Sequence, residues 1–451
     1  MKNKILNTLI ALALFIFCSC NKQLDTKPTS SIDVDDVFNT SDDVIGALKG
    51  SYDDLGDGDF YGGQLFVGAD LLGDSGQLSW SGTFEQFTQI HNKLILVNNA
   101  FVADTWLAGY KAINDVNNVL AHLDLVTDAE KDRVEGEAKF IRGSVYFDLV
   151  RMYAKAWNDG DPDDNEGVPL VLTPTTLISD SSKVKRNTVA EVYAQAISDL
   201  TDATEKCTES DNTYIYATNI AAYAMLARVY LQQQDYANAL LAENNAITLA
   251  EDNGYQLTST YAAAFPSADP PAYIPNTTED IFAMQVTATS GVNEFNTYYS
   301  ENQRGDIQIE DSFFDLYEAD DDRQNLYDGE YTLKFENYYG NVRLIRLAEL
   351  YLTRAECNFR LGSAVGAKPV DDINTVRERA NLEDYRAAQL TLDKILLERA
   401  LELSFEGFTL HDEKRLEKNV GILPWNSPKL IYPIPQREIY ANSNLTQNEG
   451  Y

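Results

Sequence analysis

The feature that most restricts the fold is a recurrence of alanine and large apolar residues between residues 220 and 250. Leu226, Ala227, Tyr230, Ala239 and Ala246 follow one another at the steps expected for two consecutive helices. Small alanine side chains let such helices approach closely, and the spacing is that of a tetratricopeptide helix pair. A hairpin of this kind cannot bury its apolar face alone, so it predicts further helices packed against it.

A second segment of the same character lies farther along the chain. Residues 347–361 form an apolar helical pattern that ends at Gly362, and Val370, Ile373 and Val376 predict an antiparallel partner. Other apolar helical patterns cover residues 40–55, 106–122, 135–153 and 188–200. Because repeated helical hairpins stack, we predict a mostly α fold on a tetratricopeptide-like, solenoid-like scaffold.

Two of these helices carry capping residues at their starts. Thr40 stands three positions before Asp43, and Thr188 stands three positions before Glu191. A threonine hydroxyl and an acid at this spacing satisfy the first free N–H groups of a helix. We therefore expect helices to begin directly after Thr40 and after Thr188.

Two stretches lack helical periodicity. Glycine and aspartate become frequent from Leu55 to Gly82, which predicts a loop insertion around residues 56–90. A second insertion is expected around 251–340, because prolines cluster there and 16 of the 49 aromatic residues fall between 250 and 341. Within it, residues 281–286 predict a short strand, so we expect only a minor β component.

The N-terminus has the pattern of a lipoprotein signal. Lys2 and Lys4 precede an apolar run from Ile5 to Phe17 that is too short to span a bilayer permanently. A small residue directly precedes Cys20, which predicts cleavage after residue 19 and lipidation of Cys20. The alternative is a plain secreted protein. We expect a signal peptide at 1–19, a lipidated tether at 20–39 and a single domain at 40–451.

The composition excludes several classes of function. A formal net charge of −34 opposes the binding of nucleic acid and disfavours polyanionic substrates, although it also serves solubility alone. Cys207 and Cys357 are the cysteines beyond the signal region, and they form no CxxC pattern. The whole chain has three histidines, so we expect neither a serine or cysteine triad nor a histidine-rich metal site.

One acidic segment resembles half of a calcium loop. Residues 159–167 place side-chain oxygens at alternate positions, as calcium-binding loops do. The twelve-residue pattern is not completed, so an acidic turn without metal is the favoured interpretation. We expect no cofactor and no metal.

The C-terminal third carries a series of motifs at residues 347–356, 373–380, 398–408 and 432–439, and it ends on residues 444–451. In this order the motifs resemble those of the SusD/RagB family. The resemblance extends to residues 137–151, 167–170 and 188–200, and so spans nearly the whole mature chain. The charged residues of these motifs suit ion pairs between helices and are expected to be structural: Arg377, Arg379, Arg399, Glu402 and Glu406.

The resemblance implies a non-enzymatic lipoprotein on the outer face of the outer membrane. Such a protein binds glycans and forms the lid of a SusC-type TonB-dependent transporter. The acidic charge favours a neutral glucan such as laminarin or starch. One alternative is a peptide-binding lid of a RagA-type importer. A glycoside hydrolase with paired carboxylates is a weaker alternative, because nothing in the sequence favours one pair of acids.

The candidate glycan site follows from the chemistry of sugar recognition. A sugar ring offers an apolar C–H face to an aromatic ring and hydroxyls to planar polar groups. Trp80 is the first choice for a stacking platform, because its small polar neighbours from Gly76 to Gly82 provide no helical face to bury it. The alternative for Trp80 is that it fills a gap between loop and scaffold. The other candidates come from the same loop and from the mid-chain insertion: Asp74, Gln77, Tyr298, Tyr299, Asn302 and Arg304.

Overall fold

The computed structural model describes residues 37–176, 179–208 and 215–451. The predicted signal peptide, the lipidation site Cys20 and the tether up to residue 36 lie outside the described residues. No helix among the described residues is long and apolar enough to cross a membrane.

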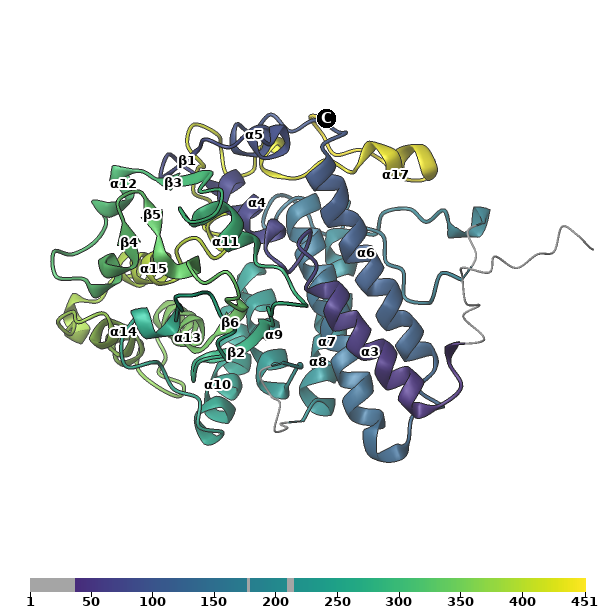
Figure 1. The fold of residues 1–451 in the computed structure, drawn as a ribbon, viewed down its shortest axis with the longest axis horizontal. Coiled ribbons are helices and arrows are strands. Elements are labelled where there is room, and N and C mark those ends of the chain that lie inside the picture. Colours follow the sequence, from purple (N-terminus) through teal and green to yellow (C-terminus); the bar gives the residue numbers. More distant parts are fainter. Residues whose placement is uncertain (1–36, 177–178, 209–214) are drawn as a thin grey trace, which may run out of the picture.

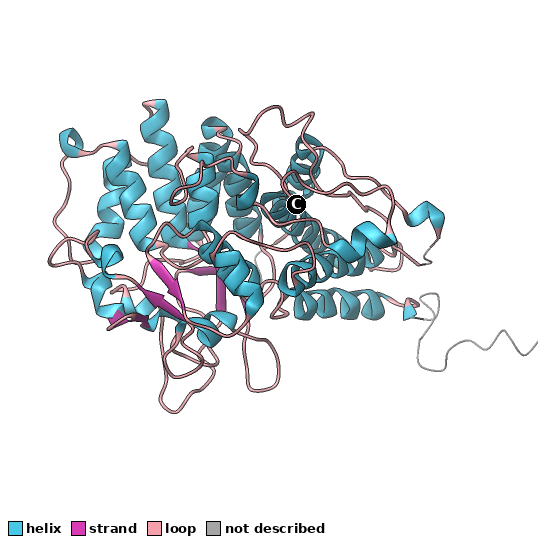
Figure 2. Cartoon of the chain, turned by 90° about the horizontal axis from the view of Figure 1, so that it is seen from above, coloured by secondary structure: helices cyan, strands magenta, loops and turns pink. Residues whose placement is uncertain are grey.

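The scaffold is a row of helices in which each helix packs on the next one in the row (Figure 1). Viewed from above, the row runs across the molecule and the few strands gather on one side of it (Figure 2). The row consists of α6 (Ala100–Ala121), α7 (Asp128–Tyr153), α8 (Val189–Lys206), α9 (Asn219–Gln232), α10 (Tyr236–Asp252), α13 (Leu347–Leu361) and α14 (Pro369–Arg379). Helix α3 (Ser41–Leu55) packs on α6, and α15 (Leu392–Glu402) packs on α13. The predicted mostly α, stacked-hairpin fold is confirmed.

Local capping explains where several of these helices begin and end. The Thr40 hydroxyl accepts a hydrogen bond from the N–H of Asp43, and Thr188 caps α8 through Glu191 in the same way, so both predicted capping boxes are confirmed. Helix α13 ends at Gly362, whose φ of 63° is left-handed and favours glycine.

The prediction of a loop insertion around residues 56–90 is wrong for much of its length. Helix α4 (Gln64–Gly73) is buried along its length, and α5 (Glu85–His91) follows after a short strand. The glycines that suggested a loop permit close packing instead. A Cβ on Gly68 would lie 2.2 Å from the Tyr432 hydroxyl, and one on Gly73 would lie 2.6 Å from the backbone nitrogen of Leu410. These are contacts that a larger side chain would prevent.

The β structure is limited to three antiparallel pairs of short strands among the described residues. Strand β1 (Leu78–Trp80) pairs with β3 (Ile307–Ile309), so that Trp80 stands opposite Ile307. The other pairs are β2 (Asp280–Met284) with β6 (Val342–Arg346), and β4 (Tyr327–Asp328) with β5 (Tyr331–Thr332). The strand predicted at 281–286 is therefore confirmed. The β1–β3 pair joins the early segment to the mid-chain segment.

Short helices complete the fold. The short α-helices are α11 (Glu294–Tyr299), α12 (Asp311–Phe314), α16 (Thr409–Arg415) and α17 (Gln436–Ala441). The 3-10 helices are η1 (Asp180–Ser182), η2 (Ala262–Ala264), η3 (Asp322–Leu326), η4 (Leu333–Phe335), η5 (Ala387–Gln389) and η6 (Pro428–Leu430). The mid-chain stretch thus consists of short elements and turns, as expected for a loop-rich insertion.

A buried ion-pair network ties α15 to β6 and α14. Arg346 contacts Glu279, Glu402 and Glu406, and Arg379 also contacts both Glu279 and Glu402. All these side chains are buried. Arg377 pairs with Glu398 on α15, and Arg399 pairs with Asp412 on α16. The structural role predicted for the charged motif residues is confirmed.

Candidate functional site

Trp80 lies beside Tyr298 because the β1–β3 pair brings the two predicted regions together. The ring centroids of Trp80 and Tyr298 are 6.0 Å apart, and Phe87 on α5 lies 5.3 Å from Trp80. The Trp80 indole nitrogen donates a hydrogen bond of 2.9 Å to the Thr88 hydroxyl. Trp80 is half-buried and packs against the hydrophobic core.

Phe84 and Arg304 extend this surface. Phe84 is 37% exposed, and its ring centroid lies 6.3 Å from that of Tyr298. The Arg304 guanidinium lies 4.4 Å over the Phe84 ring, and it also contacts Asp306 and the Thr83 hydroxyl. An arginine stacked on an aromatic ring keeps N–H donors at the edge of that ring. We call Trp80, Phe84, Tyr298 and Arg304 the aromatic patch.

The two adjacent tyrosines of α11 point to different environments. Tyr298 is 4% exposed and forms the base of the aromatic patch. Tyr299 is fully buried, and its hydroxyl donates to the Asp70 carboxylate at 3.1 Å. Burial raises the pKa of Asp70 to about 7, although hydrogen bonds from Tyr299 and from the N–H of Gly407 act in the opposite direction. The expectation that Tyr299 stacks on a ligand is therefore wrong.

Asp74 organises a turn instead of presenting a free carboxylate. One of its oxygens accepts hydrogen bonds from the N–H groups of Gly76, Gln77 and Leu78, at 2.8–3.0 Å. The other oxygen lies 3.3 Å from the His91 imidazole. Burial opposes ionisation of Asp74, but the bonds from His91 and from the backbone keep its pKa below the usual value. Asp74 thus holds the loop that leads into β1, and its predicted contact with a ligand hydroxyl is wrong.

The side chains of Gln77 and Asn302 differ in the hydrogen bonds that they make within the protein. The backbone of Gln77 is fixed by Asp74 and by the N–H of Glu310, whereas its side chain is half-exposed. The exposed Asn302 amide donates to the Glu336 carboxylate. Of the seven predicted ligand residues, the structure brings Trp80, Tyr298 and Arg304 directly together.

Phe84 was not among the predicted residues. It directly precedes α5 in Ser81-Gly82-Thr83-Phe84, four positions after Trp80, within a stretch that the sequence assigned to a loop. Its aromatic side chain, on the same stretch as Trp80, was the feature of the sequence that could have identified Phe84 as a candidate.

The calcium-like segment forms a turn held by its own side chains. The Asn165 amide donates to the carbonyl of Asp159 at 2.7 Å, and the N–H of Asp163 bonds the Asp161 carboxylate. Among the described residues, no group of three or more His, Cys, Asp or Glu side chains is placed to hold a metal ion.

The structure is a stacked helical scaffold that carries the aromatic patch on its connecting segments. Two family models match the chain. One, described as starch-binding associating with outer membrane, matches residues 23–231, and the SusD family model matches residues 325–421. The chain belongs to the SusD/RagB family, whose members are binding proteins without enzymatic activity.

Relatives and solved structures agree with this assignment. The SusD-like protein P2 of Formosa agariphila is 24% identical over the full length of both chains. The starch-binding protein SusD of Bacteroides thetaiotaomicron is 33% identical in an alignment of length 151 that covers 28% of this chain and 26% of that protein.

Among solved structures, a putative sugar-binding protein of Bacteroides vulgatus has a TM-score of 0.81 and 28% identity, covering 92% of this chain and 99% of its own. A laminarin-binding SusD-like protein has a TM-score of 0.73 at 22% identity, covering 92% and 100%, and shares the fold.

Proposed function

We propose that the protein captures a neutral glucan, such as laminarin or starch, at the cell surface and delivers it to a SusC-type TonB-dependent transporter. The observation that carries this proposal is the aromatic patch, in which two accessible rings and a guanidinium are held on a rigid helical scaffold. Stacking on sugar C–H faces and forked hydrogen bonds to vicinal hydroxyls are the contacts that such groups make.

The choice of a neutral glucan has two further supports. Relatives named for starch and laminarin share the family or the fold. The net charge of −34 repels polyanions at long range. We further propose that Cys20 carries the lipid anchor and that the protein lies on the outer face of the outer membrane. Anchoring would hold the aromatic patch near the transporter and raise its effective concentration there.

Replacement of Trp80 tests the patch directly. Trp80→Ala removes a stacking platform, so we expect the affinity for laminarin or starch oligosaccharides to fall at least tenfold, or about 1.4 kcal/mol. The same change removes the packing on Phe87 and the bond to Thr88, so stability should also fall by about 1–3 kcal/mol. Calorimetric titration and a thermal melt on one preparation measure both effects.

Matched controls separate binding from stability. Trp157 is also half-buried and packs on Tyr193 at 5.0 Å, away from the aromatic patch. Trp157→Ala should lower the thermal midpoint and leave glucan affinity unchanged. Tyr299→Phe should likewise leave affinity unchanged, because that hydroxyl is buried against Asp70. An unchanged affinity in Trp80→Ala would remove the aromatic patch from glycan binding.

The transporter partnership has its own test. Pull-down of the lipidated protein from mildly solubilised outer membranes should recover a TonB-dependent porin. Recovery of the lipoprotein alone would contradict delivery to such a transporter while leaving glycan binding intact.

A further inference from the structure

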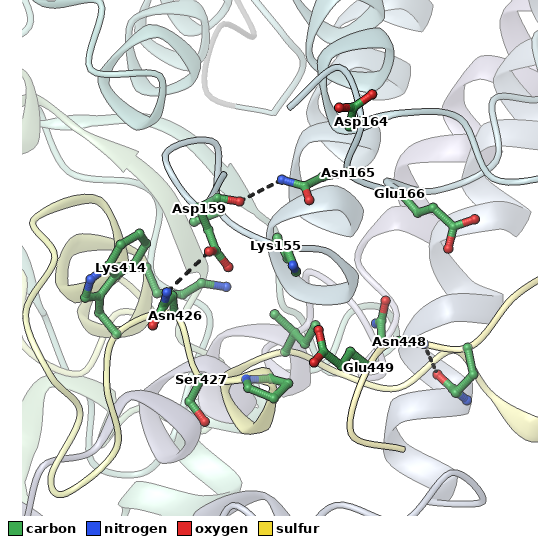
Figure 3. A pocket seen from close by; sticks show the side chains of 15 residues that line it. Lys155, Asp159, Asp164, Asn165, Glu166, Lys414, Asn426, Ser427, Asn448 and Glu449 are labelled. Carbon is green, nitrogen blue, oxygen red and sulfur yellow. Dashed lines mark hydrogen bonds between the residues drawn. The ribbon is translucent and has the colours of Figure 1, made fainter. Parts of the chain in front are cut away.

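A pocket lies apart from the aromatic patch and shares no lining residue with it. It has a volume of about 530 Å³ and is formed by the loop after α7, the segment from α16 to η6, and the last residues of the chain (Figure 3). Pockets of about 300–1,000 Å³ are the size that small ligands occupy. The loop after α7 therefore meets the C-terminal part of the chain at a ligand-sized hollow.

Lys414 brings a buried positive charge to this pocket. Its side chain lines the pocket although the residue is only 4% exposed. Its ammonium has one hydrogen bond, a contact of 3.4 Å with the carbonyl of Leu430, and no carboxylate oxygen among the described residues lies within 4.0 Å. An ammonium has three donors, and a buried donor without an acceptor is costly. Burial lowers the pKa of Lys414 to about 8, although Asp159 acts in the opposite direction.

Lys155 contributes a second cation to the wall. It is half-buried, and it too has no ion pair within the part of the chain that the structure describes. Lys414 and Lys155 thus bring two ammonium groups to the wall of one pocket. They supply donors and positive charge for an anionic group.

Four acids also line the pocket, and the charge of Asp159 acts on Lys414, but within the described residues none of them lies within 4.0 Å of either ammonium. Both carboxylate oxygens of Glu166 lie 2.7 Å from the Thr446 hydroxyl, which donates its one hydrogen to this carboxylate. Asp159 accepts a bond of 3.4 Å from the Asn426 amide. Asp164 and Glu449 are exposed. An exposed acidic rim repels a polymer of many negative charges, whereas a single anionic group can still reach the cations inside.

The remaining wall suits a sugar. Trp425 is half-buried, and it neither packs against the hydrophobic core nor pairs with another ring within the described ranges. The Asn448 amide nitrogen donates to the carbonyls of Tyr153 and Tyr432, both at 2.8 Å, which fixes the orientation of this amide. A ring that lacks a protein partner and a fixed amide are the groups that stack on a sugar face and bond its hydroxyls.

We propose that this pocket is a second saccharide site, which takes a single sugar unit bearing a carboxylate, such as a uronic acid. The carboxylate would lie against Lys414 and Lys155, the ring would stack on Trp425, and a hydroxyl would bond Asn448. The proposal extends glycan binding to a second place on the protein, and it stands on residues that the aromatic patch does not use.

The test is a titration of the purified protein with D-glucuronate, with D-glucose as its neutral counterpart and acetate as a carboxylate without a sugar. We expect glucuronate to bind at least tenfold more tightly than either compound. Lys414→Met keeps the volume of the side chain and removes its charge, so it should weaken glucuronate binding at least tenfold, as should Trp425→Ala. Equal binding of glucose and glucuronate, or of acetate and glucuronate, would overturn the proposal.

Two further variants keep the result unambiguous. Lys155→Met changes a half-buried side chain, so it tests the charge even if Lys414→Met lowers the thermal midpoint. We expect it to weaken glucuronate binding severalfold, and unchanged binding in both lysine variants would refute the proposal. Trp80→Ala should leave glucuronate affinity unchanged, and Trp425→Ala should leave glucan affinity unchanged. Loss of one activity without the other therefore shows which of the two sites has failed.

Discussion

The buried network around Arg346 allows a quantitative prediction of stability. The guanidinium makes five hydrogen bonds of 2.8–3.0 Å, which reach the carboxylates of Glu279, Glu402 and Glu406 and the carbonyl of Glu402. Arg346→Met removes all of them and leaves three acids in a buried site. Breaking a buried charge pair on one side costs about 3–5 kcal/mol. Because Arg379 still contacts two of the acids and Lys334 contacts the third, we expect the lower half of that range.

This loss converts into a measurable thermal shift. At about 2.1 cal/mol/K per residue, roughly 400 folded residues give an unfolding entropy of about 0.85 kcal/mol/K. A loss of about 3–4 kcal/mol then lowers the thermal midpoint by about 4–5 °C. Arg437→Met is the control, because Arg437 is 63% exposed and pairs with Glu438 at the surface. It should change stability by less than about 0.5 kcal/mol.

The pH dependence gives the same prediction a second check. Burial opposes ionisation of Glu402, yet the surrounding Arg379, Arg346, Arg323 and Lys334 lower its pKa to about 2. A carboxyl whose pKa is lower in the folded state stabilises the protein above its ordinary pKa of 4.5, and this contribution disappears as the pH falls towards 2. The difference between wild type and Arg346→Met should thus be largest near pH 7 and shrink below about pH 4.5. Equal midpoints near pH 7 would refute a stabilising network.

Two other predictions concern α4 and its neighbours. Asp70 has a pKa of about 7 in the folded protein, against an ordinary value of 3.8. Ionisation of this carboxyl therefore lowers the free energy of unfolding by about 4 kcal/mol as the pH rises from about 4 to 7. Chemical denaturation of Asp70→Asn should show a flatter pH profile over that range, and an unchanged profile would contradict the raised pKa. Gly73→Ala should cost about 1–3 kcal/mol, because its Cβ would meet the backbone of Leu410, whereas Gly46→Ala in α3 meets no atom within 4 Å and should be neutral or stabilising in the same melts.

The scaffold could be predicted from sequence because its determinants are local. Helical periodicity and caps such as Thr188 with Glu191 act within a few residues, and the structure has α8 beginning at Val189. Helix α4 was not predicted, because glycine occurs both in loops and at close packing contacts within helices. Gly68 and Gly73 suggested a loop. They are required instead where α4 packs against Tyr432 and Leu410, and these contacts are visible only in the tertiary structure.

The sequence indicated which parts of the chain form the candidate site, but it did not identify all of the residues correctly. Trp80 and Tyr298 meet through the pairing of β1 with β3, which no local pattern encodes. Tyr299 differs from Tyr298 only by one position on a helix, yet that position turns it into the core towards Asp70. The pocket at Lys414 and Trp425 could not be inferred from the sequence, because one of its walls comes from residues 155–166, far from the C-terminal residues that form the rest.

The central claim is glycan binding, and a calorimetric titration of the purified protein against a panel of soluble glycans and peptides tests it most directly. The aromatic patch predicts micromolar to millimolar affinity for at least one neutral glucan of the laminarin or starch type, because stacking and neutral hydrogen bonds contribute about 1 kcal/mol each. Peptides should give no heat of binding. Saturable binding of a peptide, together with no binding of any neutral glucan, would contradict the account and favour a peptide-binding lid.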